Sequence, residues 1–206
     1  RLTRAVQKTG DLLELRPGTR TGLMAYAGSS HLVMPLTTDP EIITYFASSL
    51  APELMPVAGD DPVHAVEMAA RRLREAGTPA SILLVADSID PVSHAGLVQV
   101  HEAYGFDIHV YAMAAGPDVV PPAPFLDRDA MAAAAAAGGG RLVTVTPDVS
   151  DVHTLNERVT RSIASAPAGE GARWRDMGYY LLWPLLLLSL LFWRKGGGVE
   201  LKGVGQ

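Results

Sequence analysis

The segment TGLMAYAGSSHLVMPLTTD, residues 21–39, decides how this chain folds. Residues 22–27 form a short apolar run, and Gly28 with the two serines after it predicts a turn. Residues 31–34 are then expected to return beside the first run as a second strand. We expect Pro35 to stop that strand, because proline cannot donate to a sheet ladder. The segment therefore predicts a β-hairpin.

A helix is expected to follow the hairpin at once, over residues 40–50. Thr38 or Asp39 provides a capping side chain, and Pro40 suits the first helical turn. The same signals mark residues 62–76, where Asp60 or Asp61 is the expected cap. The hairpin thus opens a series of well-delimited helices.

Helices and strands alternate along the rest of the chain. Periodic apolar residues predict helices, and continuous apolar runs predict strands buried on both faces of a parallel sheet. The expected helices are residues 3–15, 40–50, 62–76, 92–104, 127–137 and 149–164. The expected strands after the hairpin are residues 81–86, 107–112 and 142–145. This alternation predicts an α/β fold, a doubly wound and mostly parallel sheet.

Several phrases of the sequence together resemble one known family. They are TGLMAYAG, PLTTD, LAPELMP, SILLVAD and AAAGGGRLVTVT. The chain resembles the von Willebrand factor A family, and within it the membrane-anchored bacterial proteins called Bat or aerotolerance proteins. The resemblance spans about residues 1–195 and implies a Rossmann-like α/β domain over residues 1–165. It also implies that the first strand of the domain is missing from this chain and would precede Arg1.

The resemblance implies a metal-ion-dependent adhesion site built from three loops. The first, D-x-S-x-S, would precede Arg1. The second is a Gly-Thr step, matched here by residues 59–61, so that Asp60 stands where the family has threonine. The third is an aspartate after the buried strand, which is Asp87, followed by Ser88 where the family has glycine. Asp87 and Asp60 are therefore the candidate ligands of Mg²⁺ or another divalent cation, which prefer oxygen donors.

A structural interpretation of the same residues stays open. Asp60 and Asp61 are also good helix caps, and Asp87 can cap a loop turn with Ser88 and Asp90. Thr37 and the threonine after it are expected to cap the following helix rather than touch a metal. His94 and His101 lie seven residues apart with no evident third ligand, so we expect them on the surface. On this interpretation the metal site is inactive.

Composition limits the classes of function. The 206 residues are 48% hydrophobic and 19% charged, enough for one domain with a core and an additional segment. The formal net charge of -5, without a basic patch interleaved with aromatics, argues against a nucleic-acid binder. The chain has no cysteine, which excludes disulfides, cysteine nucleophiles and thiolate metal sites.

The C-terminal part predicts a membrane anchor. Residues 177–193 carry no charge, and at about 1.5 Å per residue they would span roughly 25 Å of the bilayer. We expect a linker at 166–175, a transmembrane helix at 176–195 and a polar tail at 196–206. The basic residues near the span slightly favour a cytoplasmic tail. The domain would then be periplasmic, on a single span in a bacterial inner membrane.

These observations predict a binding protein rather than an enzyme. The resemblance implies a membrane-anchored protein-interaction domain that binds partners through a divalent metal at a partly degenerate adhesion site, in envelope assembly or stress tolerance. The implied partners are other membrane or periplasmic proteins, other von Willebrand A proteins and a MoxR-type AAA+ ATPase. One alternative is a metal-free scaffold subunit. Another is a metal-dependent hydrolase using Asp87, although the sequence shows no nucleophile with a partnered base.

Overall fold

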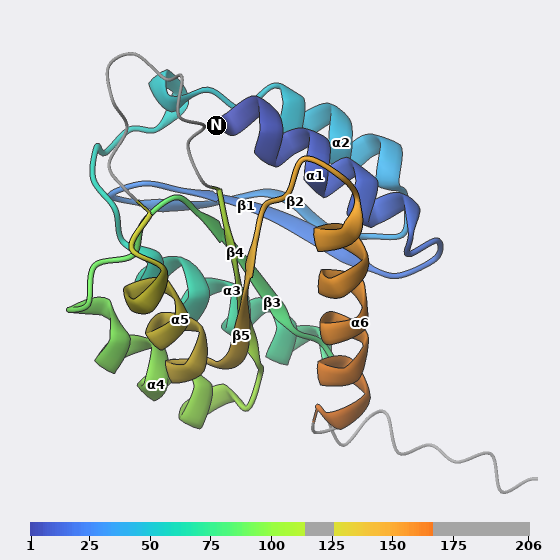
Figure 1. The fold of residues 1–206 in the computed structure, drawn as a ribbon. Helices are drawn as coiled ribbons and strands as arrows, with labels where there is room; N and C mark the ends of the chain where they lie inside the picture. Colours follow the sequence, from blue (N-terminus) through green and yellow to red (C-terminus); the bar gives the residue numbers. More distant parts are fainter. Residues whose placement is uncertain (114–125, 167–206) are drawn as a thin grey trace, which may run out of the picture. The chain divides into compact units, whose positions relative to one another are not determined.

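The computed structural model describes residues 1–113 and 126–166, and five strands in these residues form two separate sheets (Figure 1). The first sheet is antiparallel and the second is parallel, in the order β3-β4-β5. The strands are β1 (Thr21–Tyr26), β2 (Ser30–Thr37), β3 (Ile82–Ala86), β4 (Ile108–Ala112) and β5 (Gly139–Thr144). The alternating pattern therefore predicted the strands, but the described strands do not join into one sheet.

The helices lie close to their expected positions. They are α1 (Leu2–Glu14), α2 (Pro40–Ser48), α3 (Pro62–Ala76), α4 (Ser93–Tyr104), α5 (Arg128–Ala137) and α6 (Ser150–Ser165). A short 3₁₀ helix that the sequence analysis did not predict, η1 (Pro52–Leu54), follows α2. Gly77 ends α3 in the left-handed conformation, with φ of 64°, which glycine adopts without a steric penalty.

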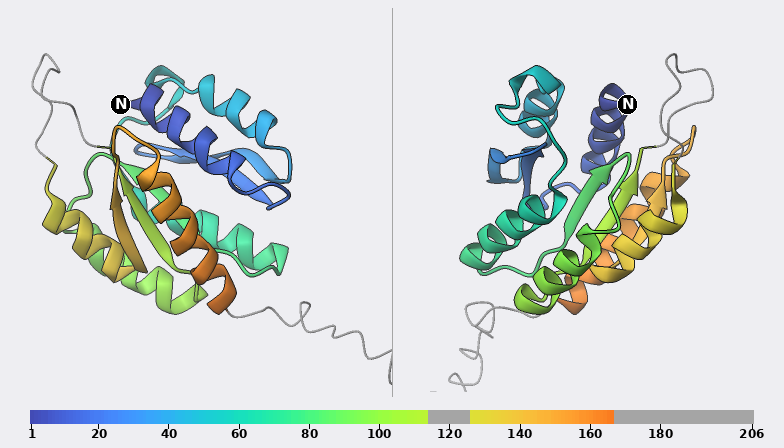
Figure 2. Two further views of the ribbon diagram at one scale, coloured as in Figure 1. Left: turned by 45° about the vertical axis from the view of Figure 1, so that its right-hand side comes forward. Right: turned by 90° about the vertical axis from the view of Figure 1, so that its left-hand side faces the viewer.

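Helices cover both faces of the parallel sheet, as two further views show (Figure 2). On one face α3, α4 and α5 bury a core with β3 and β4, including Val66, Leu97 and Met131. On the other face α1 and α6 pack over the sheet through Leu12 and Leu155. The doubly wound character of the fold is thus confirmed for this sheet.

Pro35 does not end the second strand as we expected. Strand β2 continues through Pro35 to Thr37. The prediction was wrong because β2 lies at the edge of its two-stranded sheet. On the outer edge of a strand no hydrogen bond to a neighbouring strand is needed, so proline, which lacks an N–H group, is tolerated there. The sequence alone does not show which strands lie at an edge.

Strand β3 was expected to be buried on both faces, and only one face is. Ile82, Leu84 and Ala86 are buried, whereas Leu83 and Val85 are half-buried. All five residues of β4 are buried. The difference arises because β4 has a neighbour on each side, whereas β3 pairs with β4 alone and β1 with β2 alone. One edge of β1 and one edge of β3 are therefore unpaired among the described residues.

The predicted linker, transmembrane helix and tail lie outside the described residues, apart from Ala166 at the start of the linker. Within residues 1–113 and 126–166, no helix is both long and apolar enough to cross a membrane. The boundaries of the anchor therefore stay predictions.

Candidate functional site

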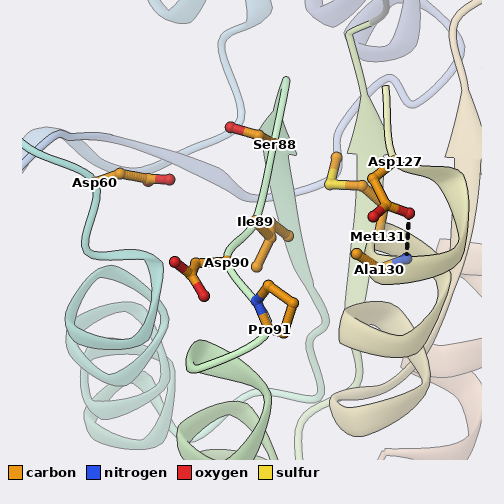
Figure 3. Close-up of a pocket in the computed structure, with 8 residues that line it drawn as sticks. All are labelled: Asp60, Ser88, Ile89, Asp90, Pro91, Asp127, Ala130 and Met131. Carbon is orange, nitrogen blue, oxygen red and sulfur yellow. Dashed lines mark hydrogen bonds between the residues drawn. The ribbon is translucent and has the colours of Figure 1, made fainter. Parts of the chain in front are cut away.

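The candidate site lies at the carboxyl end of β3, where open α/β sheets place their ligands. An open pocket of about 410 Å³ adjoins this end (Figure 3). Its lining comes from the loop before α3, the loop after β3 and the start of α5. The lining residues are Asp60, Ser88, Ile89, Asp90, Pro91, Asp127, Ala130 and Met131. Three carboxylates thus border one pocket, two of which the sequence analysis did not propose as ligands.

Close contact between two loops fixes the position of Asp60. Gly28, in the hairpin turn, donates its N–H to the carbonyl of Val57 at 3.1 Å, and Asp61 donates its N–H to the carbonyl of Ala27 at 2.8 Å. A Cβ atom on Gly28 would lie only 2.4 Å from the carbonyl oxygen of Ala58, so no larger residue fits there. The hairpin turn therefore holds the loop that carries Asp60.

Hydrogen bonds identify the aspartates that cap α3, α2 and α5. Asp61, and not Asp60, caps α3 by accepting the N–H of His64 at 3.0 Å. Asp39 caps α2, which confirms one of the two expected caps. The expectation that the threonines cap this helix was wrong, and Thr37 accepts the N–H of Asp39 at 3.2 Å. Asp127 caps α5 and so uses one carboxylate oxygen inside its own helix. Asp60 has no capping role.

The charge of Asp87, one predicted ligand, contributes to a raised pKa of Asp60, the other. Partial burial raises the pKa of Asp60, and the charges of Asp87, Asp61 and Asp90 raise it further. Burial also raises the pKa of Tyr26, and the charges of Asp60 and Asp87 add to that effect. The site therefore concentrates negative charge, which a bound cation would relieve.

Asp87 already has a cationic partner in this structure. The guanidinium of Arg1, at the start of α1, forms an ion pair with the Asp87 carboxylate. Asp87 remains partly exposed, but it is not among the residues that line the pocket. The sequence alone does not predict this pair, because only the fold brings Arg1 to the end of β3.

The donor set suits a hard cation but is incomplete. Carboxylates and the Ser88 hydroxyl are the oxygen ligands that Mg²⁺ and Ca²⁺ accept. Within the described parts of the chain, however, no three Asp, Glu, His or Cys side chains are grouped closely enough to hold a metal ion. Asp60 and Asp87 would therefore supply part of a coordination sphere at most.

The histidines do not contribute to this site. The expected surface location of His94 and His101 was wrong, since both are half-buried, and His94 Nε2 is buried without a hydrogen-bond partner. His109 is fully buried and lies 2.7 Å, through Nε2, from the Ser162 hydroxyl. The pKa of His109 is lowered, chiefly by burial, so it favours the neutral ring.

Sequence-level comparisons give no family for this chain. No family model matches it, and no curated protein matches it.

Solved structures share the fold. An aerotolerance-related membrane protein from Bacteroides fragilis NCTC 9343 aligns with a TM-score of 0.64 at 18% identity, covering 80% of this chain and 89% of that one. BatB from Bacteroides thetaiotaomicron, described as a conserved hypothetical protein, gives 0.67 at 18%, covering 81% and 89%. The vWF domain of the type V pili tip protein Mfa5 from Porphyromonas gingivalis gives 0.57 at 12%, covering 79% and 89%.

These likenesses define the class of fold. The chain has a von Willebrand-type α/β fold, with a parallel sheet between layers of helices. The resemblance to Bat-type von Willebrand A proteins is confirmed at the level of the fold. At 12–18% identity the likeness extends no further than the fold.

Proposed function

We propose that this chain is a non-catalytic, membrane-anchored protein-interaction domain of the von Willebrand A type. The observation that carries the proposal is the open, acidic pocket at the carboxyl end of β3 on a von Willebrand-type fold. Two similar structures come from proteins described as an aerotolerance-related membrane protein and as BatB. The first description supports stress tolerance and a membrane location; the proposed setting is an envelope assembly or stress-tolerance complex at a bacterial inner membrane.

We also propose that a divalent cation takes part in partner binding. Asp87 and Asp60 would hold it, and the cation would offer an open position to an acidic side chain of the partner. The proposed partners are other von Willebrand A proteins and a MoxR-type AAA+ ATPase. The raised pKa of Asp60 is consistent with a cation there, because partial burial and the nearby charges of Asp87, Asp61 and Asp90 all disfavour its ionised form.

A metal-free scaffold is the second candidate, and one observation favours it. The guanidinium of Arg1 forms an ion pair with the Asp87 carboxylate. This pair already neutralises part of the negative charge of the acidic cluster. On this reading the site is structural and partners bind without a cation.

The experiment that separates the two is calorimetry on the full chain with Mg²⁺, Mn²⁺ and Ca²⁺. The metal proposal expects a measurable heat with at least one cation, lost in Asp87→Ala. Glu102→Ala, which removes an exposed acid on α4, is the matched control and should bind as the unmutated chain does. Absence of binding heat in the unmutated chain would contradict the metal proposal and favour the metal-free scaffold.

The Tm of Asp60→Asn provides a second test, because the raised pKa of Asp60 predicts how its Tm differs from that of the unmutated chain. A carboxyl group with a raised pKa in the folded state contributes stability below its ordinary pKa of 3.8 and loses it as pH rises through the raised value. Asp60→Asn should therefore have a slightly higher Tm than the unmutated chain at pH 7, and an equal Tm below pH 3.8. Saturating cation should raise the Tm of the unmutated chain but not of the variant. An equal rise in both would show that Asp60 is not a ligand.

A further inference from the structure

Helix α2 is apolar on two opposite sides. Ile43 and Ala47 are 1% and 3% exposed and pack inward. Ile42, Tyr45 and Phe46 point outward and are 42%, 68% and 38% exposed. We call these three the outer face of α2. They are spaced three and four residues apart and so form one continuous strip.

Two other solvent-facing helices, α3 and α6, carry charges where α2 carries apolar side chains. The outer side of α3 bears the ion pair of Arg71 with Glu67, and that of α6 bears the pair of Arg161 with Glu157. Such pairs are the usual surface of a helix at the outside of a domain. No charged residue occurs from Ile42 to the end of α2. The outer face therefore differs from an ordinary solvated surface.

The outer face also has the composition of a binding surface. The rings of Tyr45 and Phe46 meet edge to face, with centroids 5.6 Å apart. Aromatic side chains are enriched in interface cores, where they often supply a large share of the binding energy. Figure 1 shows α2 on the outer side of the described part of the chain, beside α1.

The charge around this surface identifies its partner. The exposed acids Asp39 and Glu41 lie at the start of α2, and Glu53 lies in η1. Neither α2 nor η1 carries a lysine or arginine, although the neighbouring helix α1 carries the exposed Arg4. An apolar surface with an acidic border repels anionic lipid headgroups and attracts an apolar surface bordered by lysine or arginine.

We propose that the outer face of α2 binds a basic amphipathic helix of a partner protein. The apolar side of that helix would cover Tyr45 and Phe46, and its flanking lysines or arginines would pair with Glu41 and Glu53. A helix packed against α2 would contact about 14 Å of its length, since α2 has 9 residues. This surface uses none of the residues of the acidic pocket. Binding therefore needs no cation and persists in a chelator.

The test measures binding of a fluorescent Leu/Lys amphipathic helix of roughly 14 residues to the full chain, by anisotropy in EDTA. A peptide of the same composition with a scrambled pattern is the probe control. We expect the amphipathic peptide to bind, Tyr45→Ser to weaken it about tenfold, and added salt to weaken it further. Val92→Ser replaces an apolar residue that is 81% exposed and outside α2, so it should bind as the unmutated chain does.

A second variant distinguishes weaker binding from loss of the fold. Glu41→Lys leaves the apolar strip intact and should weaken binding by charge alone, with circular dichroism confirming that each variant is folded. Equal binding of both peptides, or equal loss in Tyr45→Ser and Val92→Ser, would overturn the proposal. So would binding of the outer face to phosphatidylserine vesicles with no binding of the peptide, which would assign the surface to a membrane.

Discussion

At the scale of single residues, a buried ion pair connects α1 to α6. Lys8 Nζ lies 2.8 Å from Asp151 Oδ1, and the two side chains are 7% and 0% exposed. The Tyr111 hydroxyl donates to Asp151 at 2.6 Å, and the N–H of Thr146 donates at 2.8 Å. Burial would raise the pKa of Asp151, but these hydrogen bonds outweigh it and lower the pKa. The carboxylate therefore stabilises the fold above its ordinary pKa and loses that effect in acid.

Lys8→Met should destabilise the chain strongly. Removing the cation leaves a buried carboxylate without its charge partner, which costs about 3–5 kcal/mol in comparable buried pairs. Arg72→Met is the matched control, because the pair of Arg72 with Glu75 is well exposed, and its loss should cost less than about 1 kcal/mol. Urea unfolding of both variants measures the difference. Equal losses would show that the Lys8 pair is no stronger than a surface pair.

At the scale of elements, β3 has one edge without a strand partner among the described residues. Ile82 donates to the carbonyl of Asp107 at 2.9 Å, and the carbonyl of Ala86 accepts from Met113 at 2.8 Å. In a parallel ladder alternate residues bond to the same neighbour, so Leu83 and Val85 direct their backbone groups away from β4. Those groups have no strand partner among the described residues.

Hydrogen exchange should therefore be uneven within one sheet. In this chain the amides of Leu83 and Val85 should exchange at least tenfold faster than that of Val110, which lies in the fully buried central strand β4. Exchange measured by NMR tests this directly. Protection of Leu83 and Val85 as strong as that of Val110 would mean that another strand pairs with β3.

At the scale of the whole molecule, the orientation of the predicted anchor decides which partners can reach the domain. The basic residues before the predicted span are Arg173 and Arg175, and those after it are Arg194, Lys195 and Lys202. The slight excess on the C-terminal side predicts a cytoplasmic tail and a periplasmic domain. A cytoplasmic ATPase would then need the tail or an intermediary to contact this protein.

The absence of cysteine makes this orientation easy to test. A single cysteine is placed at Ser165 in one variant and at Val204 in another. In intact spheroplasts, a membrane-impermeant maleimide should label the first and not the second. The reverse result would place the domain in the cytoplasm and allow direct contact with the ATPase.

The sequence by itself determined the local elements. Bounds such as those of α3 were predicted correctly, because Pro62 and Gly77 act on the backbone within a few residues. The fold class followed from the alternation of helices and strands, and Asp87 was placed correctly after β3. Each of these signals is short-range, so it can be read along the chain.

Only the tertiary structure decided which residues meet across the chain. It paired Arg1 with Asp87 and Lys8 with Asp151, and it placed Pro35 inside an edge strand. It also placed the hairpin strands β1 and β2 in one sheet and β3, β4 and β5 in another. The physical reason is that pairing, burial and edge position depend on neighbours far away in sequence, and a local pattern of apolar and polar residues does not specify them.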